Sequence, residues 1–157
     1  MPKGLNWSYK YYIDDSHGSV PLISEYDALH FIFSFYRFPE QGKIFEPSVS
    51  ADSSIALVKS YYENLSKHMG YEIQPEEQTI NNFGYGFLFN KKFDKAYAFF
   101  KLNIDNYPKS FNTYDSMGDY YVAKGDTVNA IEFFSKALNL KEFPQTRQKL
   151  EKLKSRK

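Results

Sequence analysis

The chain has 157 residues, of which 42% are apolar and 19% aromatic, so a folded core is expected and disorder over most of the length is not. Lysine and arginine total 20 and aspartate and glutamate total 19, so the net charge of +1 gives no general reason to expect nucleic acid or an anionic membrane as a partner. The absence of cysteine excludes disulfides, thiolate catalysis and cysteine-ligated zinc.

The first 38 residues are typical of one edge of an α/β domain. "NWSYKYYI" is rich in β-forming residues, and the alternation of Trp7, Tyr9 and Tyr11 predicts a strand over 7–13. The opening "MPKGLNWSYK" lacks the apolar core of a signal peptide, and no apolar run approaches the ~20 residues of a membrane span. One strand cannot form a sheet, so we expect the chain to begin within a larger domain.

A loop containing His17 and then a helix follow the predicted strand. Ser24 and Asp27 have N-capping spacing, and "SEYDALHFIFSFYRF" predicts an apolar, mostly aromatic helix over about 24–36. Proline and serine are frequent from residue 39 onward, which predicts a linker over 39–52.

Residues 53–157 predict a separate helical module. Apolar residues recur at helical spacing over 53–70, and Gly70 ends that stretch. A polar helix over 144–154 is expected to cap the other end of the module. Basic residues outnumber acidic ones over 145–157, which we interpret as a solvated helix face rather than a binding tail.

The clearest pattern in this module is a 34-residue repeat. Adding 34 to each of four residues matches small with small and aromatic with aromatic: Gly84 with Gly118, Phe87 with Tyr121, Ala96 with Ala130, and Phe100 with Phe134. Two helix-turn-helix units of this length, 77–110 and 111–144, are typical of the tetratricopeptide repeat (TPR). Two unrelated helical hairpins, the alternative, would need several independent matches at one offset.

The histidine loop carries a family resemblance. "YYIDDSHGSVPLISEYDALHFIF" resembles the C-terminal end of the bacterial α/β-hydrolase esterases that include the siderophore esterases, in which the catalytic histidine lies in an "HGSVP" stretch after the last strand. "LSKHMGYEIQPEEQTINNFGY" and "FKLNIDNYPKSFNTYDSMGDYY" resemble the TPR extension of bacterial members. The resemblance implies a mainly α fold class, with TPR-type helical hairpins after a short strand–loop–helix remnant of an α/β-hydrolase domain over 1–38.

By this resemblance, His17 is the catalytic general base of a serine esterase that acts on carboxylic esters. The sequence departs from the family because it contains no G-x-S-x-G motif and no earlier strand that could carry the triad acid. Asp14 and Asp15 are interpreted as solvated loop acids, and Ser16 and Ser19 lack the context of a nucleophile. The chain alone is therefore expected to be inactive.

No cofactor and no metal site is predicted. His30 lies within the predicted aromatic helix and His68 near the end of the next one, and neither has a ligand-like spacing to another histidine or a carboxylate. Aromatic residues at helical spacing are expected to form the core. They lack the basic groove that readers of stacked bases use, so nucleic acid is not expected.

The alternative function is a TPR scaffold for protein–protein interaction with no catalytic role. The side chains expected to line its groove come from the first helix of each repeat: Gln78, Asn81, Tyr85, Leu88, Asn112, Asp115, Asp119 and Val122. Asp115 and Asp119 would repel a terminal carboxylate, which favours a basic or apolar peptide or the protein's own hydrolase domain as the partner.

The backbone of residues 1–50 also needs partners. We expect this segment either to fold back on the repeats or, the favoured prediction, to pair strand 7–13 with its copy in a homodimer.

Overall fold

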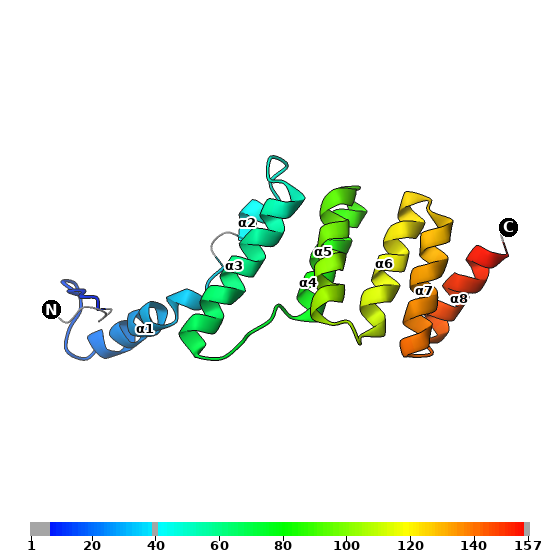
Figure 1. Ribbon diagram of the computed structural model, residues 1–157. Helices are drawn as coiled ribbons and strands as arrows, with labels where there is room; N and C mark the ends of the chain where they lie inside the picture. Colours follow the sequence, from blue (N-terminus) through cyan, green and yellow to red (C-terminus); the bar gives the residue numbers. More distant parts are fainter. Residues whose placement is uncertain (1–6, 39–40, 156–157) are drawn as a thin grey trace. The chain divides into compact units, whose positions relative to one another are not determined.

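The computed structural model describes residues 7–38 and 41–155, and the chain divides after residue 39 into an N-terminal unit and a C-terminal unit (Figure 1). Helices account for most of the described residues, and no strand occurs among them. The prediction of a mainly α fold is confirmed. Within the same residues, no helix combines the length and the hydrophobicity needed to cross a membrane.

The predicted strand over 7–13 is wrong. Residues 7–12 have no regular secondary structure, and a turn follows them. A strand needs a neighbour to pair its backbone N–H and C=O groups, and the described residues supply none. Side chains hold the segment to the following helix instead: Lys10 Nζ lies 2.5 Å from Asp27 Oδ2, and the Tyr12 hydroxyl donates to the same oxygen at 2.8 Å.

The helix predicted over 24–36 begins earlier and ends earlier. α1 extends over Val20–Ile32, and one 3-10 turn, η1, follows at Ser34–Tyr36. Pro21 lies in the first turn of α1, where its missing N–H leaves no hydrogen bond unmade. Ser24 is therefore inside the helix, and its hydroxyl donates to the carbonyl of Pro21 at 3.0 Å instead of capping an end.

The C-terminal unit contains seven helices within its described residues: α2 (Gln41–Ile44), α3 (Ala51–Met69), α4 (Glu77–Phe89), α5 (Phe93–Asn106), α6 (Phe111–Lys124), α7 (Thr127–Leu140) and α8 (Pro144–Lys154). α2 lies inside the stretch predicted as a linker, and Ile44 at its end is fully buried. The buried Lys95 of α5 fixes this end, because its Nζ donates to the carbonyls of Ile44 and Glu46 at 2.6 and 2.9 Å.

The helix predicted over 53–70 is confirmed as α3, with a start two residues earlier. The Ser50 side chain caps it by accepting from the Ser53 N–H at 3.1 Å, and Asp52 adds a negative charge to the first turn. Gly70 ends it in the left-handed conformation (φ 76°), which glycine adopts without steric cost.

The four helices predicted within 77–144 are confirmed as the hairpins α4–α5 and α6–α7 (Figure 1). In both hairpins, a glycine of the first helix contacts a phenylalanine ring of the second helix. A Cβ atom at Gly84 would lie 2.5 Å from the Phe100 ring, and a Cβ atom at Gly118 would lie 2.5 Å from the Phe134 ring. Each glycine therefore lets the aromatic ring of the second helix pack directly against the first helix.

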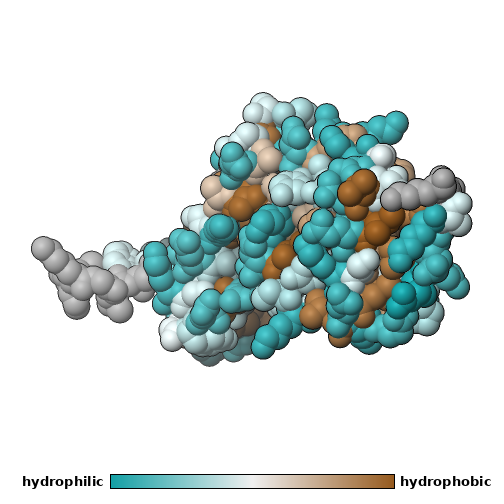
Figure 2. All heavy atoms as spheres, turned by 45° about the vertical axis from the view of Figure 1, so that its right-hand side comes forward, coloured by the Kyte–Doolittle hydropathy of each residue, from teal (hydrophilic) through white to brown (hydrophobic). Residues whose placement is uncertain are grey.

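α8 covers the open side of the second hairpin, as the sequence predicts for a capping helix. Leu150 is buried against Ala130 and Phe134, and the half-buried Leu153 packs on the same cluster. On the face drawn in Figure 2, hydrophilic side chains occupy most of the surface and hydrophobic atoms show between them. The core of this unit is thus closed by the repeats and the capping helix together.

Candidate functional site

His17 lies on the turn that leads into α1, and its side chain is exposed. It makes no hydrogen bond or ion pair with any other described residue. The two neighbouring serines bind each other, because the Ser16 backbone N–H donates to Ser19 Oγ at 3.0 Å. The His17 imidazole is therefore open to solvent, and no carboxylate or serine hydroxyl from residues 7–38 or 41–155 is bonded to it.

The other two histidines have different surroundings. The ring of His30 packs against Tyr26 within α1 in a tilted arrangement, with 4.4 Å between the ring centroids. Nδ1 of His68 lies 2.9 Å from the Asn64 carbonyl, one turn earlier in α3. Across residues 7–38 and 41–155, no three His, Asp or Glu side chains come together in a group that could hold a metal ion.

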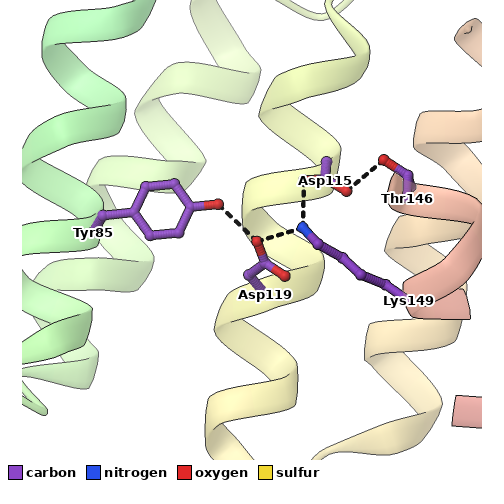
Figure 3. Close-up of polar contacts among 5 residues, drawn as sticks. All are labelled: Tyr85, Asp115, Asp119, Thr146 and Lys149. Atoms are coloured by element: carbon purple, nitrogen blue, oxygen red, sulfur yellow. Dashed lines mark hydrogen bonds and ion pairs between the residues drawn. The ribbon is translucent and has the colours of Figure 1, made fainter. Parts of the chain in front are cut away.

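A second cluster joins α4, α6 and α8 within the predicted groove (Figure 3). We call it the polar ladder, and it consists of Tyr85, Asp115, Asp119, Thr146 and Lys149. The Tyr85 hydroxyl donates to Asp119 at 2.8 Å, and Thr146 Oγ1 donates to Asp115 at 2.7 Å. Lys149 Nζ bridges both carboxylates, at 2.8 Å from Asp115 and 2.7 Å from Asp119.

The ladder follows the repeat. Tyr85 and Asp119 are 34 residues apart, and so are Asp115 and Lys149. Packing one repeat beside the next brings equivalent positions next to each other, so hydrogen bonds form between them. α8 supplies Lys149, the second member of the pair with Asp115, although its sequence is too short and too polar to form a repeat of its own.

The polar ladder is partly buried, and its charges depend on one another. The side chains of Asp115 and Asp119 are only 13% and 26% exposed. Burial opposes the charge of Lys149, but its hydrogen bonds to the two carboxylates outweigh burial and raise its pKa. Burial, and then the charge of Asp119, raise the pKa of the Tyr85 hydroxyl.

Lys149 changes how the predicted groove would meet a partner. The sequence presents Asp115 and Asp119 as two free acids, whereas the structure pairs both with one ammonium group. The local charge is therefore −1 and both carboxylates are already engaged, so their repulsion of a ligand carboxylate is weaker than expected.

The remaining groove residues lie in several environments. Gln78 and Val122 are exposed, and Leu88 is half-buried. Asn112 donates to the Glu77 carboxylate at 2.9 Å. Asn81 is buried, and its Oδ1 has no hydrogen-bond partner among the described residues. The structure thus gathers Tyr85 with the two aspartates and leaves Gln78 and Val122 open to solvent.

Sequence reasoning missed Lys149 and Thr146 because it treated residues 145–157 as a solvated face. The signal that could have found Lys149 was the 34-residue offset from Asp115, which places an opposite charge at the equivalent position. No model of a protein family, no curated protein and no solved structure matches the chain.

Proposed function

We propose that the chain is the carboxy-terminal portion of a bacterial serine esterase that acts on carboxylic esters, with His17 as the general base. Residues 53–157 are its TPR accessory module. The observation that carries this proposal is the position of His17 within "HGSVP", exposed on the turn before α1 with no partner on its ring among the described residues. Such an imidazole is free to meet a serine hydroxyl brought from elsewhere.

Ester hydrolysis by a serine nucleophile needs a histidine that can reach the serine hydroxyl. A histidine imidazole can both accept and donate a proton near neutral pH, so it takes the serine proton and returns it to the leaving alcohol. A carboxylate must hold the ring in the right tautomer. Because the sequence has no G-x-S-x-G motif, the nucleophile and the acid come from another segment of the parent protein. The chain by itself is inactive.

The bare surface of the N-terminal unit supports the same proposal. α1 contains no buried residue, and Leu29, Ile32 and Phe33 are each about half exposed. A helix that covers a sheet in an α/β domain needs such an apolar surface.

The test uses the chain joined to the region that precedes it in its gene, and it measures hydrolysis of p-nitrophenyl butyrate. The variant His17→Ala should lose about 10⁴-fold or more in kcat, as removal of a triad member does. The matched control is His30→Ala, which removes the other histidine of the N-terminal unit and should keep full activity. Retained hydrolysis in His17→Ala would end the catalytic assignment.

The second candidate is a TPR scaffold with no catalytic role, and the polar ladder favours it. The ladder links α4 to α6 and α6 to α8, and the side chains of Gln78 and Val122 are exposed. Deleting residues 40–157 from the longer protein separates the two readings. An accessory module that works on the hydrolase domain should change its kcat/KM or its Tm, whereas a scaffold for another protein should change neither.

A further inference from the structure

A pocket of about 430 Å³ lies at the start of α5, away from the polar ladder. It lies between the α2–α3 connection, the α4–α5 turn and the end of α6. Its charged lining comprises Lys91, Lys92, Lys95, Lys124 and Asp94. Phe45 and Phe93 contribute an aromatic wall. Four ammonium groups against one carboxylate give the pocket a strongly positive lining.

The buried member of this set is Lys95, which is 8% exposed. Its Nζ donates to the carbonyls of Ile44 and Glu46, which take two of its three N–H groups. These acceptors carry no formal charge, so the ammonium group has no ion pair with a described residue, and it lies 5.2 Å from the centre of the Phe87 ring. Burial lowers the pKa of Lys95, the charge of Lys92 lowers it further, and the charge of Glu46 opposes them. The pocket thus crowds like charges together.

The other three lysines are exposed, and none of their ammonium groups forms a hydrogen bond or ion pair with another described residue. The Lys124 ammonium lies 5.1 Å from the centre of the Phe93 ring. Lys91 has a left-handed backbone (φ 57°), which residues other than glycine seldom adopt. Sparsely populated backbone conformations of this kind cluster at active sites and ligand-binding segments.

The backbone N–H groups at the start of α5 add to the positive charge of the pocket. The N-cap residue of α5 is Lys92, whose side chain has no acceptor and makes no capping hydrogen bond. The N–H groups of the first turn therefore keep no acceptor among the described residues, and they carry the positive end of the helix dipole. Backbone donors and ammonium groups together favour an anionic ligand.

We propose that this pocket binds an acidic peptide segment. A carboxylate side chain meets the lysines and the first turn of α5, and a neighbouring apolar side chain packs on Phe45, which is 50% exposed, and on Phe93. The aromatic wall favours a peptide over a small inorganic anion, because an anion alone would leave that wall uncovered. The proposal is independent of the role of His17 and of the polar ladder.

The test is an NMR titration of the ¹⁵N-labelled full chain with the peptide acetyl-Glu-Glu-Phe-Glu-Glu-amide. The amide signals of residues 91–95 should shift saturably. Replacing the four glutamates by glutamine should weaken Kd about tenfold or more, because charge-assisted hydrogen bonds are lost. The triple variant Lys91→Gln/Lys92→Gln/Lys124→Gln should weaken Kd by a similar factor with an unchanged thermal transition.

The matched control removes three lysines outside the pocket, as Lys59→Gln/Lys67→Gln/Lys109→Gln, and should bind the peptide like the original chain. An equal loss in this control would mean diffuse attraction to net charge and would overturn the proposal. So would an absence of saturable shifts at residues 91–95. Inorganic phosphate is the third probe, and if it bound as tightly as the peptide, the site would be one for small anions and the peptide assignment would be wrong.

Discussion

The two units of this chain are both rich in aromatic residues, yet they use them in opposite ways. In the C-terminal unit, Phe99, Phe100 and Phe134 are fully buried. In the N-terminal unit, Phe33 and Tyr36 remain about half exposed, and α1 buries nothing. Aromatic content therefore does not make a core. In the C-terminal unit, helical spacing brings Gly84 opposite Phe100 and Gly118 opposite Phe134, and Phe99 packs on neighbouring aromatic rings.

The largest expected effect comes from deleting the same side chain in each unit. Phe134→Ala removes a fully buried ring and should lower the free energy of unfolding by about 3–5 kcal/mol. Phe33→Ala removes a ring that is 49% exposed and should change it by less than about 1 kcal/mol. Urea unfolding followed by circular dichroism measures both. Equal losses would mean that the N-terminal unit has a core after all.

A matched pair of glycines tests the repeat contact. Gly118→Ala would place a methyl group 2.5 Å from the Phe134 ring and should destabilise the chain by about 1–3 kcal/mol. Gly86→Ala has open space around its Cβ and should stabilise α4 by about 0.5–1 kcal/mol. Thermal melts should therefore shift in opposite directions. A rise of Tm in Gly118→Ala would show that the Gly–Phe contact is not the one that closes the hairpin.

The polar ladder should make stability depend on alkaline pH. The pKa of Lys149 is raised in the folded chain, so its contribution is fully present below the unfolded value of about 10.5 and is lost as pH rises through the folded value. The raised pKa of Tyr85 acts in the same direction, from about pH 10 upward. Urea unfolding at pH 8 and pH 11 should show the loss.

The variant Lys149→Met should be less stable at pH 8 by about 1 kcal/mol, because two partly buried carboxylates lose their partner and solvent screens part of the effect. It should also lose less stability than the original chain between pH 8 and pH 11. Lys136→Met, which breaks an exposed pair with Glu132, is the control and should cost less than about 0.5 kcal/mol. If the two variants lost equal stability at pH 8, the ladder would be no more than a surface ion pair.

How much the sequence could reveal differs between the units for a physical reason. The contact within each repeat was predictable because Gly84 and Phe100, like Gly118 and Phe134, lie within one hairpin. There the helical period and the length of the turn determine which residues face each other. The polar ladder was harder to predict from the sequence, because Lys149 contacts Asp115 only when α8 packs beside α6. The strand over 7–13 could not be settled from β propensity, because that preference describes a pleated surface with neighbours on it. His17 lies on the turn before α1, as the sequence predicted, whereas its role as a catalytic base stays a prediction.

The smallest expected effect concerns the exposed surface of α1. Leu29→Gln/Phe33→Gln should change the free energy of unfolding of the chain by less than about 0.5 kcal/mol, because both side chains already face water. On the proposal that this unit is the edge of a hydrolase domain, the same pair should lower the stability of that whole protein by several times as much, because there the two side chains would be buried against a sheet. Light scattering on the chain alone, with and without the double substitution, measures whether a second copy covers this surface. A homodimer that dissociates in the double variant would show that a second copy covers this surface, and a loss above about 2 kcal/mol in a monomer would show that the N-terminal unit already buries it.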